Sequence, residues 1–127
     1  MQRIETDKAP IPAGHYSQAV VHNGVAYVAG QLPIAPGQKE HKVGSIGEQT
    51  EQTLRNVQAI LQAADSDLDR VLQMTIYITD ISLWGEVNAT YIKVMGDSKP
   101  ARAIVPVKDL HYGYQIEIQA IAATGRA

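Results

Sequence analysis

The fold is decided by the stretch PARAIVPVKDLHYGYQIEIQAIAA, residues 100–123. Both ends of this stretch alternate between apolar and other side chains, which is the pattern of β-strands. In the first half, Ala101, Ala103, Val105 and Val107 share one face, and Arg102, Ile104 and Pro106 share the other. In the second half, Ile116, Ile118, Ala120 and Ala122 share one face, and Gln115, Glu117 and Gln119 share the other. We therefore expect two strands joined by a turn-rich link.

Each of these strands carries one charged residue in a largely apolar setting, Arg102 in the first and Glu117 in the second. On neighbouring strands the two could form a surface ion pair, which is worth a few tenths of a kcal/mol to about 1 kcal/mol. They could also be the two ends of a small site. The guanidinium would then bind a carboxylate, and the glutamate would transfer protons. The residue pattern alone leaves both interpretations open.

The length and composition are those of one globular domain, which we expect to span residues 1–127. A formal net charge of −2 gives no electrostatic reason to expect nucleic acid or an anionic membrane as a partner. The chain has no Cys, so disulfide bonds and thiol catalysis are excluded. It starts without the apolar run of a signal peptide, and no run approaches the about 20 residues of a membrane span. A cytoplasmic protein is expected.

Three strands are predicted in the first part of the chain. A short edge strand over residues 3–5 precedes a loop over residues 8–15 that contains two prolines. Residues 17–22 and 25–29 then flank Asn23-Gly24, and Asn-Gly between apolar runs is typical of a tight β-hairpin.

Two amphipathic helices are predicted, over residues 45–65 and 83–95. Ser45 followed by Glu48 is the residue pattern of a capping box, and Gly96 is placed to end the second helix. The apolar stripe of the first helix consists of Thr50, Leu54, Val57, Leu61 and Ala64, with Gln49 on another face. The buried stripe of the second consists of Leu83, Trp84, Val87, Tyr91 and Met95. Between the helices, residues 71–79 alternate as a strand, with Leu72, Met74, Ile76 and Ile78 on one face.

The economical arrangement of these elements is an α+β fold, a mixed six-stranded sheet with two helices packed on one face. The opposite face would carry Tyr77, Gln115, Glu117 and Gln119. That mixture of polar and apolar side chains suits a semi-polar interface between subunits.

Other chemistries find little support in the sequence. The four His residues are scattered without metal-site spacing, so no metal is expected. The chain has no GxGxxG, P-loop or GxSxG element. Tyr112 and Tyr114 lack the basic surroundings of a base-stacking site and are interpreted as packing at the start of a strand.

Several sequence blocks together resemble a known family. Arg102 shortly after Pro100, followed by the Ile116-Glu117-Ile118 strand, is similar to the end of the reactive intermediate deaminase (RidA, YjgF-like) family. The earlier blocks YSQAV, AGQLP and VNATY, at residues 16–20, 29–33 and 87–91, resemble that family in the same order. The resemblance covers nearly the whole chain.

The resemblance implies hydrolysis of small enamines and imines, of the 2-aminoacrylate or 2-aminocrotonate type, to 2-oxo acids and ammonia without metal or organic cofactor. It also implies a chorismate-mutase-like trimeric barrel with sites in the clefts between subunits. Arg102 would hold the substrate carboxylate, and Glu117 would orient a water molecule and shuttle its proton. The other residues that match the family's cleft are Tyr16, Ala29, Gly30, Asn88 and Ile104. Two of these have simpler interpretations: Gly30 could mark a bulge, and Asn88 could be an exposed helix residue.

Three positions depart from the family pattern. Ala29 stands where many members have Ser, Ile104 where Cys or Tyr is common, and Gln119 where a second Glu is usual. The first two predict a more apolar pocket and a different or slower substrate. Two other functions stay open. One is a non-catalytic binder of small carboxylates. The other is a ribonuclease or translation-inhibitor role, against which mild acidity and the lack of a basic stripe count.

Overall fold

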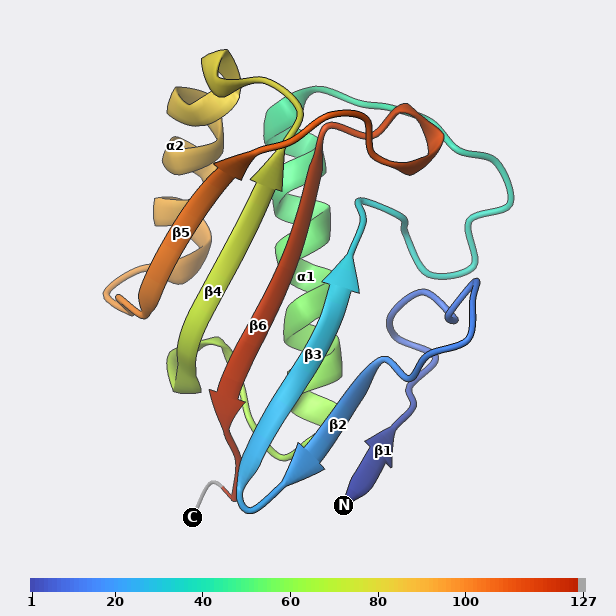
Figure 1. The fold of residues 1–127 in the computed structure, drawn as a ribbon, viewed down its shortest axis with the longest axis vertical. Coiled ribbons are helices and arrows are strands. Elements are labelled where there is room, and N and C mark those ends of the chain that lie inside the picture. The colour runs from blue at the N-terminus through green and yellow to red at the C-terminus, as the bar shows by residue number, and fades with distance from the viewer. Residues whose placement is uncertain (126–127) are drawn as a thin grey trace.

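The computed structural model describes residues 1–125, which form a six-stranded sheet with two helices on one of its faces (Figure 1). Residues 126 and 127 of the expected domain lie outside the described part. The strands are β1 (Gln2–Ile4), β2 (Ala19–His22), β3 (Val25–Gln31), β4 (Val71–Ile78), β5 (Ala101–Pro106) and β6 (Ile116–Ala123), and the helices are α1 (Ile46–Ala63) and α2 (Trp84–Met95). The predicted α+β class and the order of the elements are confirmed.

The last strand along the chain lies inside the sheet. The strand order is β1-β2-β3-β6-β4-β5, and β6 is antiparallel to both of its neighbours. β4 and β5 are parallel, which requires the long crossover that α2 supplies. β4 therefore lies between β5 and β6, and the interpretation that placed Arg102 and Glu117 on neighbouring strands is wrong.

Helix α1 packs along the middle of the sheet (Figure 1) and begins with the predicted capping box. The Ser45 hydroxyl accepts a hydrogen bond from the backbone of Glu48, and the Glu48 carboxylate accepts one from the backbone of Ser45. Leu54, Val57, Ile60 and Leu61 are fully buried against the sheet, and each such side chain contributes about 1.5–3 kcal/mol.

Gln49 is buried, whereas its place in the helical pattern predicted a different face. Its side-chain nitrogen donates to the Gly44 carbonyl and to the Gln115 side chain, and its oxygen accepts from the Gln115 backbone. These bonds satisfy a buried amide and tie the start of β6 to the start of α1.

Helix α2 lies beside α1 over the β4–β5 side of the sheet (Figure 1) and buries Val87, Tyr91 and Met95. Trp84 is 42% exposed, which corrects its assignment to the buried stripe. The angle of Trp84 around the helix axis, about 60° from Val87, lies within the stripe, so its exposure reflects its place as the first residue of α2. Gly96 ends the helix as predicted, with a φ of 60°.

A bulge in β4 overturns one further detail of the predicted pattern. Val71 pairs with Ala122 and Gln73 pairs with Ile121, so Leu72 is left out of the alternation. Leu72 is consequently 51% exposed, whereas Met74 and the two isoleucines that follow it on that face are fully buried. No helix among residues 1–125 is long and apolar enough to cross a membrane.

Candidate active site

Glu117 occupies the open face of the sheet, the face away from the helices. It pairs in register with Tyr77, two residues along from the pair of Thr75 with Gln119. On its other side β3 passes with a register shift between Val28 and Gln31, so Gly30 lies in a bulge. A Cβ atom built at Gly30 would lie 3.0 Å from Cδ of Glu117 and nearer still to Oε2. The glycine therefore gives the carboxylate room that no other residue type would leave.

Gly30 also lines a cavity of about 280 Å³ between the loop before β2, the end of β3 and the turn before β6. Tyr16 lies on the wall of this cavity and is 52% exposed. The remaining wall is largely apolar and includes Ile11, Leu32 and Tyr112. Gly30 therefore lies close to the Glu117 side chain and lines the same cavity as Tyr16. The half-buried Ala29 immediately precedes Gly30 in the chain.

Tyr112 is a wall residue to which the sequence pattern gave only a packing role. Its φ of 64° is uncommon for a residue other than glycine. Its ring stacks on His41 at 3.8 Å, and Nδ1 of His41 lies 3.2 Å from the hydroxyl of the buried Tyr114. Gln38 donates to the same hydroxyl. These contacts fix the turn before β6 against the loop between β3 and α1.

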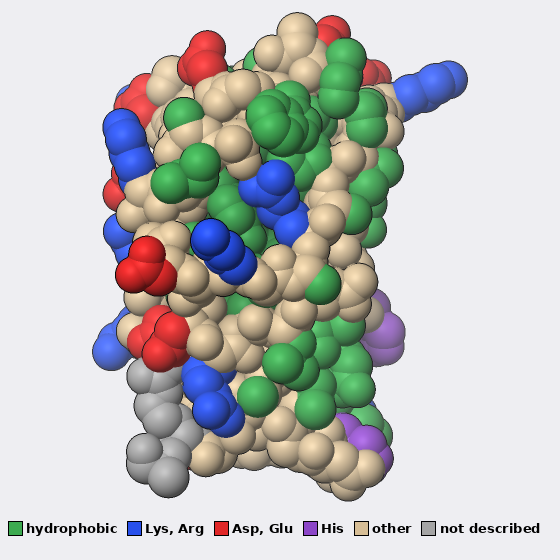
Figure 2. All heavy atoms as spheres, turned by 90° about the vertical axis from the view of Figure 1, so that its left-hand side faces the viewer, with side chains coloured by type: hydrophobic (Ala, Val, Ile, Leu, Met, Phe, Trp, Pro, Cys, Tyr) green, Lys and Arg blue, Asp and Glu red, His purple; other side chains and the backbone are tan. Residues whose placement is uncertain are grey.

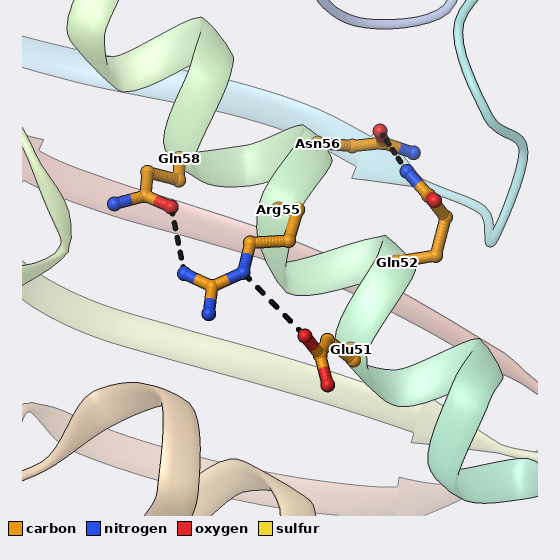
Figure 3. A network of polar contacts seen from close by, with 5 residues as sticks. All are labelled: Glu51, Gln52, Arg55, Asn56 and Gln58. Carbon is orange, nitrogen blue, oxygen red and sulfur yellow. Dashed lines mark hydrogen bonds and ion pairs between the residues drawn. The ribbon is translucent and has the colours of Figure 1, made fainter.

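Asn56 holds another part of the same wall. Figure 3 shows the polar contacts along α1, in which Gln52 donates to the side-chain oxygen of Asn56. The Asn56 nitrogen donates to the carbonyls of Leu32 and Ile34, both of which line the cavity. The Arg55–Glu51 pair in the same figure is an exposed contact at 3.9 Å, of a kind that contributes little.

Arg102 lies on the opposite face of the sheet from Glu117. It pairs in register with Met74, a core residue, whereas Glu117 pairs with Tyr77. Because side chains alternate along a strand, Arg102 points to the helix-covered face and Glu117 to the open face. The predicted alternation within β5 and within β6 is confirmed, but the surface ion pair between Arg102 and Glu117 is not formed.

Two residues of α2 hold the guanidinium group. Nη1 of Arg102 donates to Oδ1 of Asn88 at 2.8 Å, and Cζ lies 4.8 Å from the centroid of the Tyr91 ring. Asn88 is therefore in contact with Arg102, and it is not the isolated exposed residue of the simpler interpretation. Ile104 lies two residues further along β5 and packs against the core. Sequence reasoning placed Tyr91 in the core only, because its spacing in the helix is that of a buried stripe.

Arg102 stays exposed beside a cavity of about 420 Å³ between α2 and the segment that leads into β5. The lining includes Tyr91, Met95, Pro100 and a second cation, Lys99. Figure 2 shows this side of the molecule, where Lys and Arg side chains lie among hydrophobic ones. An exposed guanidinium with donors to spare suits a carboxylate ligand.

Burial raises the pKa of the Tyr91 phenol above its ordinary value, and the nearby charge of Arg102 offsets part of this rise. The phenol is therefore protonated at neutral pH, although its hydroxyl has no hydrogen-bond partner among residues 1–125. Within that part of the chain, no group of three or more His, Cys, Asp or Glu residues is placed to hold a metal ion.

The predicted site residues thus form two groups on opposite faces of the sheet. One group contains Glu117 and Gly30 with Tyr16, and the other contains Arg102 with Asn88 and, two residues along β5, Ile104. β4 lies between the two strands that carry the charged residues. A single chain does not bring Arg102 and Glu117 together.

Comparison with known proteins gives the same assignment along nearly the whole chain. The family model described as endoribonuclease L-PSP matches residues 6–124. A RutC family protein of Pyrococcus horikoshii is 43% identical over 119 residues, which cover 94% of each chain. The 2-iminobutanoate/2-iminopropanoate deaminase of Rattus norvegicus is 39% identical and covers 96% of this chain and 89% of its own. Among solved structures, TdcF of E. coli with bound serine has a TM-score of 0.92 at 30% identity, with 98% of this chain and 100% of TdcF covered. The chain therefore belongs to the endoribonuclease L-PSP family, the RidA (YjgF-like) family that its motifs resemble.

Proposed function

We propose that this protein is a deaminase that hydrolyses small 2-imino and 2-enamino acids to 2-oxo acids and ammonia. The observation that carries the proposal is that Arg102 is held in place and free to bind an anion. It is oriented by Asn88 and Tyr91, it is exposed, and it is not neutralised by Glu117. The name of the rat relative supports the reaction, and the serine bound to TdcF supports a small amino-acid-like ligand.

In this proposal the two charged residues have separate tasks. Arg102 binds the substrate carboxylate through paired N–H donors and holds the imine carbon in place. Glu117 orients a water molecule and takes one of its protons as the oxygen bonds to that carbon. That proton passes to the nitrogen, which gives a carbinolamine. Glu117 then transfers the hydroxyl proton of the carbinolamine to the same nitrogen, the C–N bond breaks, and ammonia leaves as the carbonyl forms. An enamine enters this sequence after protonation on carbon and loss of a proton from nitrogen give the imine.

The site is complete only between two copies of the chain, because one copy holds Arg102 and Glu117 on opposite faces of its sheet. We assign a homotrimer, the assembly that the family resemblance implies, in which the open sheet faces meet and the edge strand β5, which carries Arg102, lies at the border between two copies. That face carries Tyr27, Tyr77, Val105, Glu117 and Gln119, a semi-polar mixture suited to an interface. Tyr16 of one copy would approach Arg102 of the next.

The departures at Ala29 and Ile104 leave this cleft with fewer polar groups, which favours substrates with apolar side chains. A soluble, cytoplasmic enzyme of this kind would remove reactive imines released by other enzymes, a role in metabolite damage control. The products are ordinary metabolites.

The test couples the purified protein to a threonine or serine dehydratase, which releases the enamine, and follows formation of the 2-oxo acid. Acceleration above spontaneous hydrolysis, lost in Arg102→Ala, is the expected result. Binding of 2-oxobutanoate without any acceleration would instead identify a non-catalytic carboxylate binder. Wild-type acceleration by Arg102→Ala would refute the assignment of the anchor.

A further inference from the structure

We infer that Tyr91 is a positioning residue for Arg102, and that its aromatic ring fixes the orientation in which the guanidinium meets the substrate carboxylate. The inference rests on the carboxylate-binding role proposed for Arg102. It adds a residue to which the sequence pattern gave only a place in the core.

Among residues 1–125, the guanidinium of Arg102 is supported by the Tyr91 ring and by the Asn88 side chain. Cζ of Arg102 lies 4.8 Å from the ring centroid, within the about 6 Å at which a cation is attracted to a ring face. Asn88 takes one N–H through its side-chain oxygen at 2.8 Å. Asn88 and Tyr91 are three residues apart in α2 and so lie on one side of the helix. The ring supports the cation from one side, and the Asn88 amide oxygen accepts one of its N–H groups.

The ring, and not the hydroxyl, is the part of Tyr91 that acts on Arg102. Tyr91 is only 6% exposed, and its hydroxyl has no hydrogen-bond partner within residues 1–125. A buried hydroxyl without a hydrogen-bond partner destabilises the folded protein. Packing alone therefore does not explain why a tyrosine occupies this position. The face of the ring, by contrast, has a cation against it.

Without this support, Arg102 would be a long, exposed side chain at the edge strand of the sheet. Such a side chain samples many rotamers, and ordering it on each binding event weakens binding. Tyr91 and Arg102 also line the same cavity of about 420 Å³, so the ring shields one face of the guanidinium from water. Shielding strengthens the attraction between the cation and a carboxylate. Loss of the ring should therefore weaken carboxylate binding much more than it slows proton transfer at Glu117.

The test compares Tyr91→Leu with Tyr91→Phe by calorimetric titration with 2-oxobutanoate, steady-state kinetics with the dehydratase-coupled assay, and thermal unfolding. Tyr91→Leu should weaken 2-oxobutanoate binding and raise KM by roughly tenfold, with a much smaller change in kcat. Tyr91→Phe should recover most of the lost binding, because it restores the ring. In an Arg102→Ala background, Tyr91→Leu should weaken binding no further.

Val87→Ala is the matched control, since it opens space in the same buried stripe one turn earlier and removes neither an aromatic ring nor a hydrogen-bonding group. It should lower thermal stability and leave the Kd for 2-oxobutanoate unchanged. Wild-type Kd and KM values in both Tyr91→Leu and Tyr91→Phe would overturn the inference. Equal loss in both variants would overturn it too, and would assign the effect to the hydroxyl. Wild-type protein that binds 2-oxobutanoate but hydrolyses no imine would refute the proposed catalysis alone, and the Kd comparison would still decide the role of Tyr91.

Discussion

Replacing Gly30 by Ala should disable Glu117 while leaving the fold nearly intact. The added Cβ would lie 3.0 Å from Cδ of Glu117 and 3.3 Å from Cγ, both inside the 3.4 Å at which ordinary contact begins, with Oε2 nearer still. The three nearest atoms all belong to one flexible side chain, so the carboxylate can move aside and the backbone need not. The substitution also removes backbone freedom from the unfolded chain, so the change in unfolding free energy should stay within about 1 kcal/mol.

The displacement of the carboxylate should be about 1 Å, and a misplacement of that size can cost a catalytic group about 10²-fold in rate. We therefore expect Gly30→Ala to lower kcat by roughly 10²-fold with a small change in melting temperature. The measurements are the dehydratase-coupled assay and thermal unfolding of the same preparation. Gly85→Ala is the matched control, because a Cβ at Gly85 would meet, apart from its chain neighbours and the backbone of its own helix, nothing within 4 Å among residues 1–125.

Adding Glu117→Gln to Gly30→Ala separates this mechanism from a direct steric block of the substrate. If Gly30 acts only by giving room to Glu117, the double variant should be no slower than Glu117→Gln alone. Wild-type turnover by Gly30→Ala would refute the reasoning, since the close approach would then have no bearing on catalysis.

Further outcomes follow from the same geometry. Arg102→Ala should abolish imine hydrolysis with the fold retained, and Arg102→Lys should restore little, because a point charge cannot replace the planar guanidinium; full activity of the lysine variant would contradict this. Glu117→Gln should lower turnover by about 10²–10⁴-fold with 2-oxobutanoate affinity little changed, and an equal loss of both would mark Glu117 as a structural residue. Activity and particle mass, followed by light scattering over a dilution series, should fall together, and a fully active monomer would move the site into one chain. Hydrogen bonds with the backbone and the side chain of Ser45 hold the pKa of Glu48 below its ordinary value. Ionised Glu48 therefore stabilises the folded protein at pH values above its ordinary pKa. This stabilisation is lost as the pH falls through the lower pKa that Glu48 has in the folded protein. The difference in unfolding free energy between wild type and Glu48→Ala should shrink on acidification, and a difference independent of pH would count against the capping interaction.

Most of the fold could be predicted because its signals are local. Alternation in the strands, Asn23-Gly24 in the hairpin and the Ser45–Glu48 pair each report on a few neighbouring residues. The position of β6 could not be predicted in this way. Strand pairing joins residues far apart in the chain, and β5 and β6, which are successive in sequence, are separated by β4.

The candidate site was predictable in its residues and not in its arrangement. Arg102 and Glu117 were identified as isolated charges, but their faces depend on register, which the bulges at Gly30 and Leu72 locally change. Tyr91 was missed because a tyrosine in an apolar helical stripe has the same pattern whether or not a cation lies on its ring. The wall contacts of Tyr112 were missed because His41 is distant in sequence.

The central position of β6 has a consequence for how the molecule forms. During synthesis from the N-terminus, the hairpin strands and the β4–β5 pair emerge well before the strand that joins them. Until β6 arrives, β3 and β4 each present an unpaired edge, and such edges promote association between chains. Deleting β1 would only shorten one margin of the sheet, whereas deleting β6 would divide it into two separate pieces.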